Sequence, residues 1–514
     1  MWGYPGGVGV RWLAQEFAQQ GGELGRRTVW GGTVVFASTI VQRLTGLVLL
    51  ALLARLLCPE DYGLFGMVLA LTSLLTVFSD LGLGWAIVQR QDLTPQQVSN
   101  VFWVNLALGL LLGLLTIAAG PALAGFYGQE RLIGLTLLCG ASFPLAALGM
   151  QHAALLQRQM AFGAIAAAEI IGLVAGGLCG IALACKGFGV YALVGQQLVQ
   201  TAVTAAANWF GCPWRPGWPR RSAGLGGAAR FGGFLTLYNI VNYFARNLDR
   251  ILLGRLWGPA ALGLYTRAYA LMLYPIGLVS LPATRVMIPA LATLQHDLAR
   301  LRQAYLRSLQ LIAFASFPLM AFLIVAAREV VALVYGSQWL PAAPLFQILC
   351  LAGLGQAVYN ATGQVFIATG RTDRLFRAGL ALALLLAVAF VLGVLYGPQG
   401  VAAAYAAAFT IALVPFLLYA YRTIGLPLRL VLTGISPSLL CAVSLIPVGL
   451  LLRRLLTPAY PPWLTLAGLS LVLAAQYLLL SWRFNRPLLK DLARRFPPLA
   501  LAIGGRLAWW RPAP

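Results

Sequence analysis

The feature that most constrains this chain is a succession of long apolar runs. A helix needs about 20 residues to cross the hydrocarbon core of a bilayer. Only 10% of the residues are charged, whereas soluble domains carry about 25%. The sequence therefore predicts an all-α polytopic membrane protein with about fourteen transmembrane helices. The predicted spans cover residues 30–57, 64–88, 99–119, 131–156, 162–184, 188–210, 231–254, 264–292, 306–327, 342–369, 376–396, 400–421, 430–452 and 463–482.

Lysine and arginine are distributed unevenly over the loops between these runs. On alternate loops and termini, one side collects 24 of them and the other collects 7. This is the asymmetry that places basic loops in the cytoplasm. Both termini are therefore expected to be cytoplasmic. The net charge of +23 follows from this topology, and we expect no nucleic-acid partner.

The chain contains an internal repeat at an offset of 200 residues. Leu52–Leu71 and Leu252–Leu271 share 9 identities in 20 positions, and Arg55, Pro59 and Gly63 recur as Arg255, Pro259 and Gly263. Transporters are commonly built from such repeats, with the substrate between the two halves. We predict two six-helix lobes related by a pseudo-twofold repeat, plus two carboxy-terminal helices. The predicted divisions are an amino-terminal arm (1–29), an N-lobe (30–210), a cytoplasmic linker (211–230), a C-lobe (231–422), a last helix pair (430–482) and a basic cytoplasmic tail (483–514).

Five arginines lie inside predicted spans, namely Arg43, Arg246, Arg250, Arg267 and Arg285. One arginine at the centre of a membrane helix costs about 2.5–3.5 kcal/mol even on the lowest scale. Such charges are retained where they face a wet cavity or a partner. Guanidinium groups are permanently charged, planar donors that suit phosphate oxygens. The sequence therefore predicts a membrane protein that handles an anionic substrate.

Predicted span seven carries a polar stripe. Asn239, Asn242, Arg246, Asp249 and Arg250 fall within an arc of about 100° on a helix. A helix facing lipid would not carry this stripe. One interpretation is a substrate site in which Asp249 orients the two arginines, and the other is a structural salt-bridge network. The excess of arginine over acid in the spans favours the substrate site.

Other charged residues are weaker candidates. Arg43 shares a face of span one with Gln42 and is expected to face inward, unless it extends to the membrane interface. Arg267 and Arg285 lie near opposite ends of span eight, so each is either substrate-binding or interfacial. Three acids could carry a coupling proton or cation, or could be structural partners of nearby groups. These acids are Asp80, Glu169 and Asp249.

Motifs for catalysis and cofactor binding are missing from the sequence. The only lysines, Lys186 and Lys490, are not followed by the Ser or Thr of a nucleotide-binding loop. The acidic pair at 60–61 becomes Ala260-Ala261 in the repeat, so we interpret it as part of a turn rather than a catalytic pair. The two histidines and seven cysteines show no metal-ligand spacing. We expect a carrier without cofactor or metal, and not an enzyme.

Four segments resemble the Wzx-type oligosaccharide flippases of the multidrug/oligosaccharidyl-lipid/polysaccharide exporter superfamily. These segments are Leu53–Phe65, Phe78–Arg90, Asn247–Tyr265 and Val334–Trp339. The resemblance covers about residues 30–425 and is strongest to the colanic-acid/lipopolysaccharide exporter branch. It implies a bacterial inner-membrane protein that moves undecaprenyl-pyrophosphate-linked oligosaccharide repeat units to the periplasmic leaflet. The partners it implies are this lipid-linked substrate, membrane lipid, and a polymerase with other assembly proteins.

The resemblance also implies site residues. Arg43, Asp249, Arg250 and Arg267 lie where such proteins line a central cavity. Our hypothesis is alternating access, with the pyrophosphate held by arginines 43, 246 and 250 and with asparagines 239 and 242 bonding sugars or phosphate oxygens. Three alternatives stay open. They are a flippase for lipid-linked peptidoglycan precursors, a multidrug cation antiporter and, as an enzyme, a polysaccharide polymerase.

Overall fold

The computed structural model describes the backbone of residues 23–79, 94–219, 226–295, 297–456, 460–486 and 488–489. Within helices, the side chains of 23–36, 226–242, 245–246, 280–286, 288–290, 292 and 372 are not described. Across these described ranges the ordered elements are helices, and none is a strand. The sequence-based prediction of an all-α protein is therefore confirmed.

The helices overlap the predicted apolar runs, although several begin five to eight residues before the predicted start. Before residue 226 they are α2 (Glu23–Leu56), α3 (Pro59–Thr76), α5 (Pro95–Ala118), α6 (Gly120–Tyr127), α7 (Arg131–Gly140), α8 (Ser142–Arg158), α9 (Phe162–Cys185) and α10 (Tyr191–Gly211). The next are α11 (Gly226–Thr293), α12 (Leu298–Val325), α13 (Ala327–Val334), the 3₁₀ turn η1 (Ser337–Ala342), α14 (Ala343–Ala368) and α15 (Thr372–Gly393). The last are the 3₁₀ turn η2 (Val394–Tyr396), α16 (Gly397–Ile424), α17 (Leu428–Val443), α18 (Leu445–Leu456) and α19 (Pro462–Phe484).

Ten stretches among the described residues are long and apolar enough to cross a membrane. One of them, Asp373–Ile424, has 52 residues and contains two helices, α15 and α16. The chain is thus a multi-pass membrane protein, as its composition indicates. The number of fourteen crossings stays a prediction.

By its internal contacts the chain divides into two units, Met1–Thr266 and Arg267–Pro514. The division falls inside α11. The lobe and linker boundaries inferred from the repeat stay a prediction.

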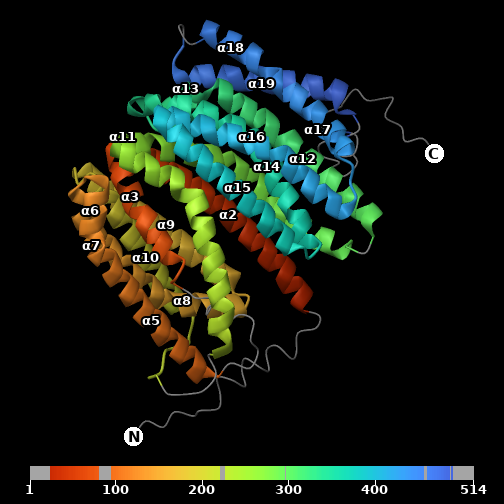
Figure 1. Ribbon diagram of the computed structural model, residues 1–514. Coiled ribbons are helices and arrows are strands. Elements are labelled where there is room, and N and C mark those ends of the chain that lie inside the picture. Colours follow the sequence, from red (N-terminus) through yellow and green to blue (C-terminus); the bar gives the residue numbers. More distant parts are fainter. Residues whose placement is uncertain are drawn as a thin grey trace. The chain divides into compact units, whose positions relative to one another are not determined.

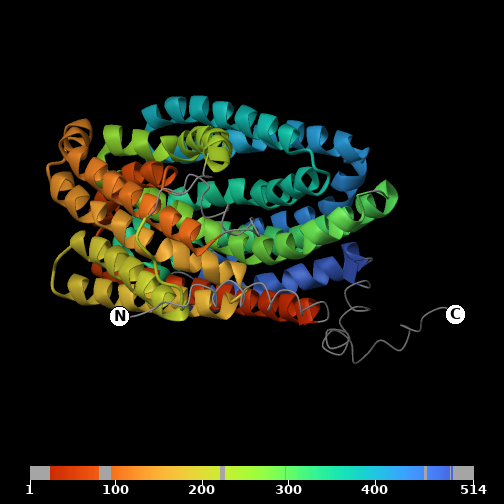
Figure 2. The same cartoon turned by 90° about the horizontal axis from the view of Figure 1, so that it is seen from below.

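In the first unit, α9 and α10 form an antiparallel hairpin, drawn in yellow in Figure 2. The two helices approach closely because small residues recur along α9. A side chain at Gly172 or Gly176 would overlap atoms of α10, at Thr204 and Gln196 respectively. Stripes of small residues allow such close packing in membranes, where helices gain little from hydrophobic burial. Helix α2 packs against α9, and α5 packs against both α7 and α8.

The segment after α10 returns to the beginning of α5. The Trp103 indole donates a hydrogen bond to the Gly217 carbonyl at 2.8 Å, and the Gly217 amide donates to the Ser99 hydroxyl at 3.0 Å. The Trp103 and Trp218 rings stack with centroids 6.0 Å apart. The segment after α10 and the beginning of α5 therefore lie together, and the charge pattern assigns both to the same side of the membrane.

Helix α11 consists of two segments separated at Gly258. This residue has φ 79° and ψ −179°, a conformation that favours glycine. The break falls between predicted spans seven and eight. At the equivalent position of the repeat, Cys58 precedes α3 and its amide donates to the Asp61 carboxylate at 3.2 Å. The acidic pair at 60–61 therefore begins a helix, since Asp61 caps it and Glu60 lies 3.6 Å from Arg131.

The second unit is built around α12, α14, α16 and α17. Its core contains a hydrogen-bonded cluster in which the Tyr305 hydroxyl lies 2.9 Å from Thr362 and 3.1 Å from Tyr421. Helices α17, α18 and α19, drawn in blue in Figure 1, pack beside α12 and α13. A buried ion pair joins them, since Arg453 Nε on α18 lies 2.8 Å from Glu329 Oε1 on α13.

Candidate functional site

The described part of the polar stripe on α11 forms a compact network. Asp249 is 3% exposed, and its carboxylate accepts from the Tyr265 hydroxyl at 2.8 Å and from the Arg250 amide at 2.8 Å. Arg250 is half-buried, and its Nη1 donates to Asn247 Oδ1 at 3.3 Å. Tyr265 comes from the second segment of α11, beyond the break at Gly258. The Asp249 carboxylate lies on the first segment of α11, and its hydrogen bond from Tyr265 therefore links the two segments of the helix.

This arrangement refines the role of Asp249. A carboxylate that is fully buried and hydrogen-bonded to a tyrosine is held in one orientation. It keeps the neighbouring Arg250 backbone and its own side chain fixed, and Arg250 as a whole is half-buried. The acid is thus placed to position the Arg250 backbone, and its direct contact with a substrate stays a prediction.

Helix α2 places a second arginine in the same unit, and α9 places an acid there. Arg43 is exposed. Its neighbour Gln42 donates from Nε2 to Glu169 Oε2 on α9 at 2.8 Å. Glu169, one of the candidate coupling acids, therefore contacts Gln42, which directly precedes Arg43.

Several predicted site residues lie outside the described side chains. The backbones at Asn239, Asn242, Arg246 and Arg285 belong to α11, and Asp80 lies outside the described backbone. Arg267 is half-buried in the second unit, where its carbonyl accepts from the Tyr335 hydroxyl at 3.3 Å. The joint binding of substrate by these arginines stays a prediction.

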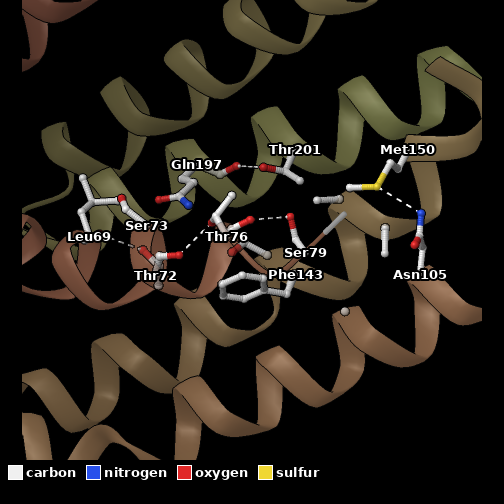
Figure 3. A pocket seen from close by; sticks show the side chains of 14 residues that line it. Leu69, Thr72, Ser73, Thr76, Ser79, Asn105, Phe143, Met150, Gln197 and Thr201 are labelled. Carbon is white, nitrogen blue, oxygen red and sulfur yellow. Dashed lines mark hydrogen bonds between the residues drawn. The ribbon is translucent and has the colours of Figure 1, made fainter. Parts of the chain in front are cut away.

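A cavity of about 200 Å³ lies inside the first unit, among α3, α5, α8 and α10. Figure 3 shows the hydroxyl side chains of α3 on one side, Gln197 and Thr201 of α10 on another, and the Phe143 ring beside them. None of its lining residues is charged. They are Leu69, Thr72, Ser73, Thr76, Ser79, Asn105, Gly109, Ser142, Phe143, Ala146, Ala147, Met150, Gln197 and Thr201.

Sequence reasoning missed this cavity and the Glu329–Arg453 pair. Serine and threonine occur in membrane helices without a functional role, so their presence gave no signal. Asn105 is the only amide side chain in the apolar run 101–119, and a polar residue inside a span is a usable signal.

More than half of the chain, residues 52–344, matches the family described as "Polysaccharide biosynthesis protein". The chain belongs to this family. The resemblance inferred from the sequence is therefore confirmed at the level of the family.

Two characterised relatives illustrate the similarity. The chain is 29% identical over 350 residues to the teichuronic acid biosynthesis protein TuaB of Bacillus subtilis (strain 168), covering 68% of this chain and 71% of the relative. It is 28% identical over 372 residues to the lipopolysaccharide biosynthesis protein WzxC of Escherichia coli (strain K12), covering 72% and 76% respectively. A third relative, 27% identical over 59% of this chain and 61% of its own length, is the succinoglycan biosynthesis transport protein ExoT of Rhizobium meliloti (strain 1021).

Solved structures share the fold. The lipid II flippase MurJ in an inward closed conformation has a TM-score of 0.72 at 17% identity, over 89% of this chain and 99% of its own. An inward-facing multidrug resistance transporter of the MATE family has a TM-score of 0.58 at 17% identity, over 75% and 94%. The architecture is thus that of multi-span transporters, in agreement with the predicted class.

Proposed function

We propose that this protein is a flippase that moves undecaprenyl-pyrophosphate-linked oligosaccharide repeat units from the cytoplasmic to the periplasmic leaflet by alternating access. The observation that carries the proposal is a half-buried arginine, Arg250, whose guanidinium donates to Asn247 and whose amide donates to Asp249. It lies inside a stretch that is long and apolar enough to cross a membrane. A permanent charge at this depth is stabilised when an anionic group binds it. The names of the relatives, which concern teichuronic acid, lipopolysaccharide and succinoglycan, support an oligosaccharide substrate.

In this mechanism the arginines bind the pyrophosphate while the lipid tail remains in the bilayer. Arg43 and Arg250 supply guanidinium groups from the first unit, and Arg267 supplies one from the second. Arg246, Arg285, Asn239 and Asn242 belong to the same proposed site. Asp249 acts as the positioning residue for Arg250, because its carboxylate is already occupied by the Tyr265 hydroxyl.

Glu169 is the proposed coupling acid that the structure describes in most detail. Its carboxylate accepts from Gln42 across α2 and α9, so its protonation would alter the contact between these helices. Asp80 and Asp249 are the other two proposed coupling acids. These acids would carry a coupling proton or cation.

We place the protein in the bacterial inner membrane with both termini in the cytoplasm. The basic loops support this orientation. Contacts within the first unit also group the loops as this topology requires, since Glu60 lies beside Arg131 and the Trp218 carbonyl accepts from Gln96 at 2.9 Å. The proposed partners are the lipid-linked oligosaccharide, membrane lipid, and a polymerase with other assembly proteins.

Transport in proteoliposomes tests the proposal. Fluorescent undecaprenyl-pyrophosphate-linked oligosaccharide is added, and its appearance in the opposite leaflet is followed. Arg250→Gln and Arg43→Gln should each lower the rate at least about tenfold, since a charge-assisted hydrogen bond contributes about 1.5–3 kcal/mol. Arg131→Gln, at the exposed arginine that begins α7, is the matched control. Unchanged rates in both site variants would refute the arginine site.

Lipid II serves as the second substrate in the same assay, because the fold is shared with a lipid II flippase. Faster movement of lipid II than of the oligosaccharide lipid would favour the peptidoglycan-precursor alternative.

A further inference from the structure

The uncharged cavity of the first unit is lined by hydroxyl groups that already donate hydrogen bonds to backbone carbonyls. Thr72 donates to the Val68 carbonyl at 3.2 Å, and Thr76 donates to the Thr72 carbonyl at 2.7 Å. Ser79, Ser142 and Thr201 likewise donate to backbone carbonyls of their own segments. A hydroxyl that donates to the backbone keeps its oxygen lone pairs for a ligand. The oxygens of these five hydroxyl groups can therefore accept hydrogen bonds from a ligand in the cavity.

Two amide oxygens add to this acceptor character. Asn105 is 1% exposed; its nitrogen donates to the Met150 sulfur at 3.3 Å, and its Oδ1 has no partner among the described residues. Gln197 Oε1 is also buried and has no partner in the described part of the chain. A buried amide oxygen without a donor destabilises the fold. Both oxygens line the same cavity, so a ligand bound there would satisfy them.

The size and the apolar wall narrow the class of ligand. A cavity of 150 Å³ admits benzene, and this one has about 200 Å³, which is enough for a substituted six-membered ring. Phe143 supplies a flat apolar face for the C–H groups of such a ring. A bare metal cation is far smaller and would find no carboxylate among the lining residues to balance its charge.

We infer that this cavity binds one uncharged sugar ring of the oligosaccharide head group. The inference rests on the proposed function and extends it, because it separates sugar recognition from pyrophosphate binding. The sugar hydroxyls donate to the oxygens of Thr72, Asn105 and Gln197, and the ring lies against Phe143. The cavity opens beside Ser73, Thr76 and Ala146, whose side chains are exposed.

The position of the cavity fits loading from the cytoplasm. Thr76 ends α3, and Asn105 lies in the first half of α5. The charge pattern assigns the beginning of α5 to the cytoplasmic side, and Thr76 lies near the middle of predicted span two (64–88). A sugar presented on that side would therefore meet the cavity before translocation.

Binding to the full-length protein in lipid nanodiscs tests the inference with two probes. One is bare undecaprenyl pyrophosphate, and the other is lipid-linked repeat units extracted from the producing cells. Thr72→Val and Asn105→Leu should each weaken binding of the sugar-bearing probe about two- to tenfold, as expected for one lost hydrogen bond. Binding of the bare probe should not change. Thr116→Val is the matched control, because Thr116 is a buried threonine that donates to its own helix at 2.8 Å and lies outside the cavity.

A stability measurement and a second cavity variant distinguish loss of sugar binding from loss of folding. The thermal unfolding midpoint shows whether each variant is folded. Should Asn105→Leu not fold, Ala146→Phe blocks the cavity from an exposed position and should give the same selective loss. Equal losses for both probes, no loss for either, or sodium-dependent stabilisation that Thr72→Val abolishes would each overturn the sugar site. Failure of the proposed function would look different, because wild-type protein would then bind neither probe or Arg250→Gln would have no effect.

Discussion

Gly63 and Gly263, 200 residues apart, each pack against the proline that begins the other's helical segment. A side chain at Gly63 would overlap the carbonyl oxygen of Pro259, and one at Gly263 would overlap the carbonyl oxygen of Pro59. The two copies of the internal repeat therefore contact each other within the first unit, and each copy supplies one glycine and one proline to the contact. Pro59 and Gly63 therefore have the same packing role as Pro259 and Gly263.

We predict that Gly63→Ala and Gly263→Ala separate α3 from the second segment of α11. Overpacking of this kind costs about 1–3 kcal/mol, so the thermal unfolding midpoint of each purified variant should fall. Gly163→Ala is the control, since a side chain there meets nothing within 4 Å. An unchanged midpoint in both variants would show that these segments do not pack as described.

The hydrogen bond between Asp249 and Tyr265 should stabilise the broken helix α11. Tyr265→Phe removes the hydroxyl and leaves a buried carboxylate oxygen without its donor, at a cost of about 1–3 kcal/mol. Asp249→Asn should cost a similar amount. A double-mutant cycle on unfolding free energy should give a coupling of at least about 0.5 kcal/mol. Additive effects would mean that the two side chains act independently.

The Glu329–Arg453 pair should hold the last helices on the second unit. Its side chains are 4% and 20% exposed, so Arg453→Leu leaves a buried carboxylate without its ion-pair partner. Breaking a buried pair costs about 3–5 kcal/mol. The exposed pair Glu60–Arg131, with side chains 50% and 68% exposed, should lose no more than about 1 kcal/mol on Arg131→Ala. Chemical unfolding of both variants measures the difference, and equal losses would contradict the burial argument.

Cysteine labelling should report the orientation of the chain. Cys58 and Cys185 are exposed at helix ends that we assign to the periplasm, and Cys212 is buried at the opposite end of α10. In single-cysteine variants, a membrane-impermeant maleimide added to cells should label the first two and not the third. Labelling of Cys212 in preference to Cys58 would invert the proposed topology.

The Cys58 label should also depend on pH. Partial burial raises the pKa of this thiol above its ordinary value. The thiolate is the reactive form, and below the pKa its fraction grows about tenfold with each pH unit. The labelling rate of Cys58 in the purified protein should therefore rise steadily above pH 7. A rate that levels off near neutral pH would contradict the raised pKa.

The sequence by itself determined the class of this protein. Apolar runs of span length must form helices, because backbone groups in a bilayer have no water to bond. The approximate positions of these helices were predicted, and so was an interruption between spans seven and eight, where Gly258 has non-helical backbone angles. The stripe containing Asp249 and Arg250 was also visible, since residues three and four apart share a helix face.

Only the tertiary structure decided the partners of these residues. Periodicity along one helix says which face a side chain occupies, and it contains no information about the neighbouring helix. The Tyr265 hydroxyl that occupies Asp249, the Gln42–Glu169 contact and the cavity around Asn105 all join segments far apart in the sequence. Such contacts depend on how closely small residues allow helices to approach, and that is a property of the packed molecule.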